Sequence, residues 1–348
     1  VTAEEARQLT ESFNNSSLYP PIEDGYYVLS TPEQLQLFAF MVNTGMANIN
    51  GKLTADIDLK DIEFTPIGWN LTDDCLAAND TYVFRGTFDG QGHTISNLVI
   101  NKPQSIGVGF FGNIGSPATI KNLRLDNTCA ITGYDRTGLI GRSQGSGDIY
   151  LEGLGNEGSV TSNVAAAGIL GNANSGSIAH LTNCYSTGAI MQSGGFATGM
   201  DCAQICGWFG SVGATVDICW SISPASGYQE ISRISWLKNN SATVRSHRYS
   251  LYGDGSQATL IKPEEVADGT LTWNLNGGLT ENPVWRQNLG TDAHPVLDAT
   301  HAIVEKAEDG SFHNIGGESG IADAVEADTP VCVTDLQGRV LRSVSGNG

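Results

Sequence analysis

The chain has few basic residues and no long apolar run. Its 348 residues include 18 Lys and Arg against 37 Asp and Glu, which gives a formal net charge of −19 at pH 7. This acidic balance argues against nucleic acid and anionic membrane as partners, because both require a basic surface. No apolar stretch approaches the roughly 18 residues of a membrane span. We therefore expect no membrane insertion, and an acidity that serves mainly solubility.

The sequence also lacks the motifs of common enzyme classes: no G-x-S-x-G, no H-E-x-x-H and no phosphate-binding loop. Among its carboxyls, Asp56 and Asp58 would share one strand face, close to Asp61. Their spacing lacks the glycine and terminal glutamate of a calcium loop, which favours a solvated strand face. Asp89 and His93 could form a catalytic pair, but their glycine-rich segment is typical of a turn. The sequence thus predicts no catalytic residue, no metal site and no cofactor.

Cysteine usage adds no clear site. The seven cysteines are an odd number, so at least one is unpaired. Cys202 and Cys206 have a C-x-x-x-C spacing, but no matched Cys/His pair follows at zinc spacing. The sequence begins Val1-Thr2 without a methionine, which is compatible with the removal of a signal segment.

Four copies of a Gly-x-x-Gly unit organise the middle of the chain. They occupy residues 109–112, 138–141, 168–171 and 207–210. Their final glycines are 29, 30 and 39 residues apart, and a period in this range is typical of a solenoid of stacked repeats. A leucine-rich-repeat horseshoe is the alternative solenoid, but its L-x-x-L-x-L-x-x-N pattern is absent.

Two columns of residues recur with the same period. The first column lies thirteen residues after each final glycine and contains Leu125, Leu154, Cys184 and, after a shortened link, Cys219. The second column contains Ile131, Val160 and Ile190. Such columns indicate rungs that place equivalent side chains above one another in a shared core. We therefore expect Cys184 and Cys219 to be buried small hydrophobes.

The rungs are predicted to be β-strands. Their apolar stretches are short, lie between Gly, Ser, Asn and Thr, and show no sustained helical period. The 43 glycines suit many tight corners. Successive coils must pair in parallel, and parallel crossovers are right-handed in nearly all proteins. The predicted fold is therefore all-β, a right-handed parallel β-helix with a cap at each end.

The flanking segments predict the caps and the regions of the chain. Ser30, Thr31, Pro32 and Glu33 precede an apolar run and indicate the start of an N-terminal capping helix over about residues 31–44, which Gly45 would end. A second, weaker helical pattern precedes it. We divide the chain into four regions: a helical cap (1–51), the β-helix (52–222), a covering and C-terminal capping segment with a short helix (223–300), and an acidic linker with a partial hairpin (301–348).

Several segments resemble GLUG-motif proteins. They are Leu-Thr-Ala-Asp-Ile-Asp-Leu (53–59), Pro-Ile-Gly (66–68), Gly-Thr-Phe-Asp-Gly-Gln-Gly-His-Thr-Ile (86–95), the Gly-x-x-Gly units and the turn 183–188. The resemblance covers about residues 25–222 and implies a secreted or surface protein of bacteria, similar to regions beside adhesins and IgA-protease-like proteins. It implies a right-handed parallel β-helix and no defined chemistry. The loop 70–82 and the insertion 192–204 depart from it, and residues 331–341 resemble the first hairpin of a C-terminal sorting domain.

The candidate ligand-binding residues are Tyr185, Trp220 and Asp126. Tyr185 and Trp220 follow inward cysteines, so strand alternation turns both outward, in one column with Asp126 and Gly155. The two rings could form a sugar-stacking platform. Alternatively, residues 221–260 could cover them, which is the favoured interpretation because large aromatic side chains usually find cover.

These observations favour an adhesin-like protein, secreted or on the outer cell surface, that binds a host or microbial ligand without catalysis. The ligand could be a glycan or a host protein, and we expect a monomer. A polysaccharide lyase or glycoside hydrolase is one alternative, which would need at least two carboxyls and a basic residue in one groove. A structural spacer within a larger surface protein is another. Because fold-level analogy is a weak basis for function, all three stay open.

Overall fold

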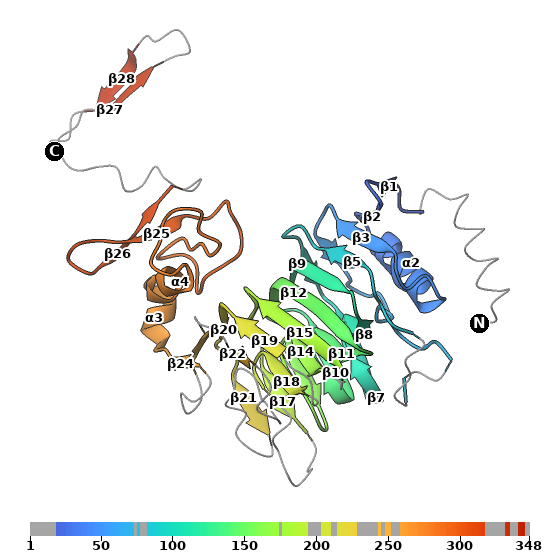
Figure 1. The fold of residues 1–348 in the computed structure, drawn as a ribbon. Helices are drawn as coiled ribbons and strands as arrows, with labels where there is room; N and C mark the ends of the chain where they lie inside the picture. The colour runs from blue at the N-terminus through green and yellow to red at the C-terminus, as the bar shows by residue number, and fades with distance from the viewer. Residues whose placement is uncertain are drawn as a thin grey trace. The chain divides into compact units, whose positions relative to one another are not determined.

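The computed structural model describes residues 19–72, 75–76, 82–173, 176–193, 203–209, 214–227, 243–244, 248–251, 258–316, 331–334 and 340–344. The chain divides into two compact units, Val1–Pro263 and Glu264–Gly348. Stacked parallel strands make up most of the first unit (Figure 1). The expected helical pattern near the N-terminus and most of the insertion 192–204 lie outside the described residues.

The first unit is a parallel β-helix with three sheets. The long sheet contains β1 (Ile22–Glu23), β2 (Tyr26–Leu29), β3 (Asn50–Leu53), β4 (Ile57–Asp58), β5 (Thr87–Asp89), β6 (Thr94–Ser96), β9 (Thr119–Leu125), β12 (Gly147–Asn156), β15 (Ser177–Thr182), β16 (Tyr185–Ser186), β19 (Ala214–Asp217), β20 (Cys219–Ser221), β22 (Thr243–Val244), β23 (Arg248–Ser250) and β24 (Thr259–Leu260). The second sheet contains β7 (Val99–Val108), β10 (Ala130–Thr137), β13 (Ser159–Ser162), β17 (Ile190–Gln192) and β21 (Ala225–Gly227). The third sheet contains β8 (Phe111–Gly115), β11 (Ile140–Gln144), β14 (Leu170–Ala173) and β18 (Cys206–Phe209).

Each coil visits the third, the long and the second sheet in turn. The sheet orders follow from this path: β8-β11-β14-β18 in the third sheet and β7-β10-β13-β17-β21 in the second. The predicted parallel β-helix is therefore confirmed. The segment 53–59 falls in two strands, since β3 ends at Leu53 and β4 spans Ile57–Asp58.

The first three Gly-x-x-Gly units stack as their period predicts, because Phe111 pairs with Ile140 and Ile140 with Leu170. The fourth unit is three residues out of register, since Leu170 pairs with Cys206, which precedes Gly207, and Phe209 pairs with Ala173. The final glycine of the second unit is required by packing, since a Cβ on Gly141 would collide with the main chain of Gly107. Because Gly141 has no side chain, the main chain of Gly107 in β7 can lie directly against β11.

The two columns have different outcomes. The second is confirmed, because Ile131 pairs with Val160 and Val160 with Ile190. In the first, Leu154 lies beside Leu123 rather than Leu125, although all these leucines share one buried core. The cause is a difference in turn length. Paired residues of β8 and β11 are 29 positions apart in the sequence, but paired residues of β9 and β12 are 31 apart, so the turn before β12 is two residues longer than the turn before β9. The turn after β12 is shorter, and paired residues of β10 and β13 are again 29 apart.

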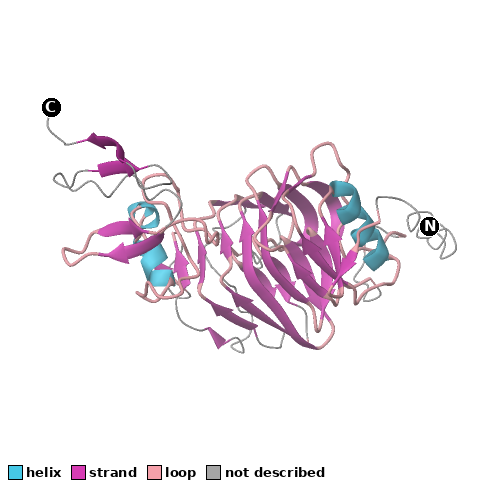
Figure 2. Ribbon diagram, turned by 90° about the horizontal axis from the view of Figure 1, so that it is seen from above, coloured by secondary structure: helices cyan, strands magenta, loops and turns pink. Residues whose placement is uncertain are grey.

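An N-terminal helix packs against the first coils. This helix, α2 (Pro32–Asn43), begins as expected, with Thr31 as the N-cap whose Oγ1 accepts a hydrogen bond from the Gln34 amide at 3.3 Å. The Phe38 ring meets Phe84 and Phe88 edge to face, with centroids 6.1 and 5.8 Å apart. In Figure 2 the helix lies beside the first strands of the stack. Burial of this apolar helix face against the aromatic end of the core fixes its position.

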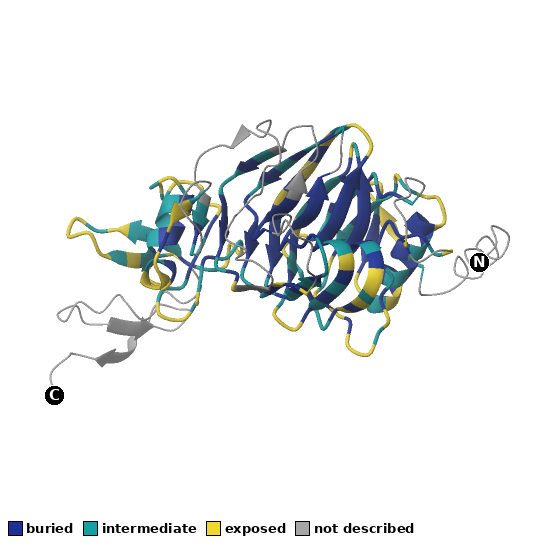
Figure 3. Cartoon of the chain, turned by 90° about the horizontal axis from the view of Figure 1, so that it is seen from below, coloured by how far each residue is buried: buried dark blue, intermediate teal, exposed yellow. Residues whose placement is uncertain are grey.

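The ladder of the long sheet extends beyond the expected boundary at residue 222. It continues through β23 and β24 to Leu260. Buried residues make up much of the stacked strands, whereas exposed residues occur in turns and loops and at some strand positions (Figure 3). The expected covering segment therefore contributes at least these strands to the β-helix itself.

In its described residues the second unit contains two short helices and two antiparallel hairpins. Its elements are α3 (Pro263–Ala267), α4 (Thr270–Leu275), β25 (Ile303–Lys306), β26 (Phe312–Ile315), β27 (Val331–Thr334) and β28 (Val340–Val344). Gln287 is fully buried and joins its parts, since its amide accepts from Thr272 and donates to the Val266 carbonyl at 3.0 Å. The expected short helix and the hairpin after residue 330 are present. Within the region assigned to an acidic linker and partial hairpin (301–348), β25 and β26 form a further hairpin over residues 303–315.

Candidate functional site

Tyr185 and Trp220 lie together on neighbouring coils. Their ring centroids are 5.0 Å apart and their planes are inclined by 9°. However, Tyr185 is 2% exposed and Trp220 is fully buried. The Tyr185 ring lies over Gly155, where a Cβ would collide with it. The sequence correctly predicted that the two rings lie side by side. Because both rings are buried, the structure favours the prediction that they are covered over the prediction of an open sugar-stacking platform.

Asp126 does not share their column. Gly155 pairs with Tyr185 on one side and with Arg124 on the other, so Arg124 occupies the position that we assigned to Asp126. Asp126 lies in the turn after β9, where its carboxylate accepts hydrogen bonds from the amide and hydroxyl of Thr128 at 3.0 and 2.5 Å. The two-residue difference in turn length that displaces Leu125 also displaces Asp126.

Arg124 stands at the centre of a hydrogen-bonded cluster. Its Nε and Nη2 donate to the Thr94 hydroxyl at 3.1 and 3.0 Å, and its Nη1 lies 3.5 Å from a Glu157 carboxylate oxygen. The same oxygen accepts the Tyr185 hydroxyl at 2.7 Å. Burial, with the neighbouring Glu157 carboxylate, raises the pKa of Tyr185 well above its ordinary value. The phenol therefore stays protonated and is not a ready general base.

The acidic groups of the first coils serve as local acceptors. Asp56 accepts from the Thr94 amide at 2.9 Å and lies 3.2 Å from His93 Nδ1. Asp58 accepts from the side chain of Asn97 at 2.8 Å, and this bond, with one from the Lys60 amide, lowers the pKa of Asp58. These bonds tie one coil to the next. No group of three or more His, Cys, Asp or Glu in the described part of the chain is placed to hold a metal ion.

The outer face of the long sheet carries alternating charges. Lys52, Asp89, Lys121 and Glu152 are successive register partners, and we call them the charged row. Lys121 Nζ lies 3.2 Å from a carboxylate oxygen of Asp89. Asp89 thus pairs with Lys121 rather than with His93. Opposite signs on adjacent strands balance one another within this row.

The row next to the charged row contains an aromatic pair that the sequence analysis missed. Tyr150 on β12 pairs with His180 on β15, and their rings stack with centroids 5.0 Å apart and planes inclined by 17°. Tyr150 is 48% exposed. The signal was present, because each ring lies between two buried residues of an alternating strand. The repeat columns drew attention to inward positions instead.

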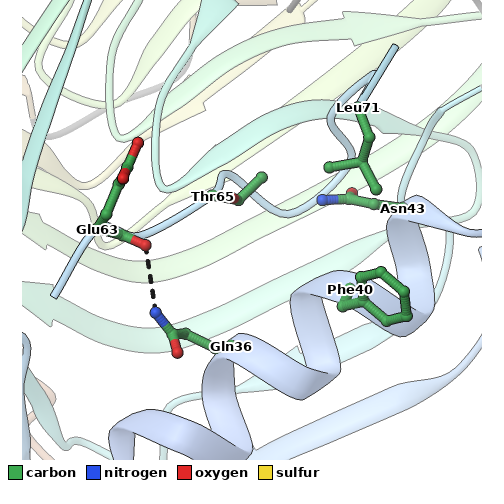
Figure 4. Close-up of a pocket in the computed structure, with 6 residues that line it drawn as sticks. All are labelled: Gln36, Phe40, Asn43, Glu63, Thr65 and Leu71. Atoms are coloured by element: carbon green, nitrogen blue, oxygen red, sulfur yellow. Dashed lines mark hydrogen bonds between the residues drawn. The ribbon is translucent and has the colours of Figure 1, made fainter. Parts of the chain in front are cut away.

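A small pocket lies between α2 and the following loop. Its volume is about 190 Å³, and its lining residues are Gln36, Phe40, Asn43, Glu63, Thr65 and Leu71. Figure 4 shows Gln36 donating to the Glu63 carbonyl, at 3.2 Å. The Asn43 amide is held by the Pro66 carbonyl and by the main-chain amides of Gly68 and Trp69. Glu63 is the single carboxyl in this lining, so the pocket contains no catalytic pair.

Cys184 and Cys219 are buried as expected. Burial raises the pKa of the Cys206 and Cys219 thiols well above the ordinary value, so both stay protonated and unreactive. Cys202 lies outside the described residues. Of the helices in the described ranges, none has the length and apolar character needed to cross a membrane.

Comparison with known proteins gives two likenesses, and no family model matches the chain. The GLUG-motif resemblance therefore stays a prediction. An alignment 140 residues long, which covers 37% of this chain, is 37% identical to halomucin of Haloquadratum walsbyi, and it spans about 1% of that protein's length. The crystal structure of a putative immunoglobulin A1 protease from Bacteroides ovatus superposes with a TM-score of 0.50 and 18% identity, covering 81% of this chain and 95% of that one. At this identity the second likeness shows a shared fold alone, and the first concerns a small part of a much longer protein.

Proposed function

We propose that this chain is an adhesin-like module of a secreted or surface-displayed protein that binds an extracellular ligand without catalysis. The open outer face of the long sheet carries the proposal. Outward residues of β3, β5, β9 and β15, and of the first half of β12, are half-buried or exposed, although Gly155 and Tyr185 are buried. The third sheet, by contrast, is buried on both faces from β8 through β14. A regular, wide and accessible face on a stiff stack is suited to a large ligand.

Two further observations support the proposal. The charged row is balanced along the face, so a ligand meets ordered hydrogen-bonding groups without strong repulsion there. The local likeness to halomucin supports a position outside the cell or at its surface. The net charge of −19 would keep such a module soluble and apart from acidic polymers.

A glycan-cleaving enzyme is the second candidate. Arg124 and Glu157 lie in contact, and Asp56 shares Thr94 with Arg124, so two carboxyls and one basic group gather near one point. Against it, Tyr185 is buried and protonated, and both carboxyls already accept hydrogen bonds. The likeness to the Bacteroides protein concerns the fold and adds no chemistry.

The test places the purified chain on arrays of host and microbial glycans and of extracellular host proteins, alongside a reducing-sugar release assay. Binding without new reducing ends is the expected result. Thr119→Arg, on the outer face of the long sheet, should weaken binding, whereas the matched Thr132→Arg on the second sheet should not. New reducing ends would establish the enzyme instead. Absence of any ligand would favour a structural spacer.

A further inference from the structure

We propose that Tyr150 and His180 form a stacking site for an uncharged sugar residue of an extracellular glycan. This inference rests on the proposed function and names the ligand class and the residues. Tyr150 is the most exposed aromatic side chain of the long sheet's described strands, at 48%. Such a ring on a regular outer face contributes nothing to the core beneath it, which Ile149 and Leu151 fill.

The ring pair is held in one orientation. His180 Nε2 lies 2.8 Å from a carboxylate oxygen of Asp148, and its Nδ1 lies 2.9 Å from the Thr215 hydroxyl. With both nitrogens engaged on different strands, the imidazole cannot turn, and its plane sets the plane of the stacked Tyr150 ring. A rigid ring loses little conformational entropy when a ligand binds, so the site is preorganised.

One face of the Tyr150 ring is available. His180 covers the face toward the following coil, whereas the register partner on the preceding coil is Thr119, whose side chain is much smaller. The small Thr119 side chain therefore leaves that face of the Tyr150 ring accessible to a ligand. The flat C–H face of a sugar ring fits against an aromatic face, which attracts polarised C–H groups through its quadrupole.

Hydrogen-bonding groups surround the ring. Strand alternation places Asp148 and Glu152 on the same outer face as Tyr150, two residues before and after it, and both are exposed. Lys121 is the register partner of Glu152 on the side of Thr119. Carboxylates accept hydrogen bonds from hydroxyl groups and an ammonium group donates, so this ring of groups suits the hydroxyls of a sugar.

Charge decides between glycan classes. Two carboxylates, Asp148 and Glu152, flank Tyr150 on its own strand against one nearby cation, Lys121, and the whole chain carries a formal charge of −19. Uronic and sialic acid residues would be repelled, whereas uncharged hexoses and pentoses would not. The occupant that fits is therefore an uncharged oligosaccharide. An extended peptide would seek a free strand edge, and this site lies inside the sheet.

The experiment measures binding of hexameric gluco-, manno-, galacto- and xylo-oligosaccharides, with oligogalacturonate as the acidic counterpart. We expect wild-type protein to bind at least one uncharged probe and Tyr150→Ala to weaken that binding about tenfold, which corresponds to the loss of about 1.4 kcal/mol of stacking. Tyr150→Phe keeps the ring and should bind. Tyr134→Ala removes a tyrosine of similar exposure, 37%, from the second sheet and should leave binding unchanged.

Three results would overturn the site. If Tyr150→Ala binds an uncharged probe as well as wild type, the site is wrong although the proposed function stands. If only oligogalacturonate binds, the charge argument is wrong. If none of the probes binds while an extracellular host protein does, the ligand class is wrong and an adhesin-like function still holds. Circular dichroism of each variant confirms that a lost signal does not reflect unfolding.

Discussion

Replacing Leu154 by alanine is a direct test of the stacked interior. Leu154 is fully buried on β12, beside Leu123 on the preceding coil. The substitution removes three carbon atoms, and at about 0.8 kcal/mol for each buried methylene the lost transfer free energy is roughly 2.4 kcal/mol. The cavity that remains adds to this, so we expect the free energy of unfolding to fall by about 3 to 5 kcal/mol.

The assay is urea unfolding followed by circular dichroism and tryptophan fluorescence. Val99→Ala is the matched control, because Val99 is an apolar side chain in β7 that is 60% exposed, and its change should stay within about 0.5 kcal/mol. If the alanine variant does not fold, Leu154→Val removes one carbon atom and should cost about 1 kcal/mol. A loss at Leu154 no larger than at Val99 would refute the shared core.

Three further predictions concern the cap, the coil contacts and the titrating groups. Thr31→Ala should lower the free energy of unfolding by about 1 kcal/mol, while Thr31→Ser, which keeps the N-cap oxygen, should restore it. Gly188→Ala should lower the free energy of unfolding by about 1 to 3 kcal/mol, because the new Cβ would collide with the Gly158 carbonyl. The neighbouring Thr187→Ala should change it little, and equal unfolding midpoints for the two variants would contradict this packing. Burial raises the pKa of Cys129 from 9.0 to about 12, so the folded state favours the neutral thiol. The contribution of this thiol to the free energy of unfolding should therefore be fully present below about pH 9 and should be lost as the pH rises toward about 12. Cys129→Ala should flatten this decline in urea midpoints measured across the alkaline range, and an unchanged slope would count against the assignment.

The repeats made the architecture predictable because their period is a local property of the sequence. The first three Gly-x-x-Gly units and the column of Ile131, Val160 and Ile190 recur at intervals that a single coil must repeat, and the structure pairs them as predicted. The helix over 32–43 was predictable for the same reason, since Thr31 and Pro32 are start signals within one turn. These features depend on neighbours along the chain.

The candidate site was less predictable, because it depends on contacts between coils. Counting from the glycines placed Leu125 and Asp126 two residues away from their true partners, since the turns before and after the strand differ in length and compensate. Strand alternation turned Tyr185 outward, but whether a later segment covers an outward ring is set by packing. Likewise, Tyr150 and His180 are thirty residues apart, and only the register of β12 on β15 brings their rings together. The sequence by itself thus determined the solenoid and its period, because both follow from local patterns. The tertiary structure alone decided the register and the exposed face, because these depend on how turns of unequal length stack.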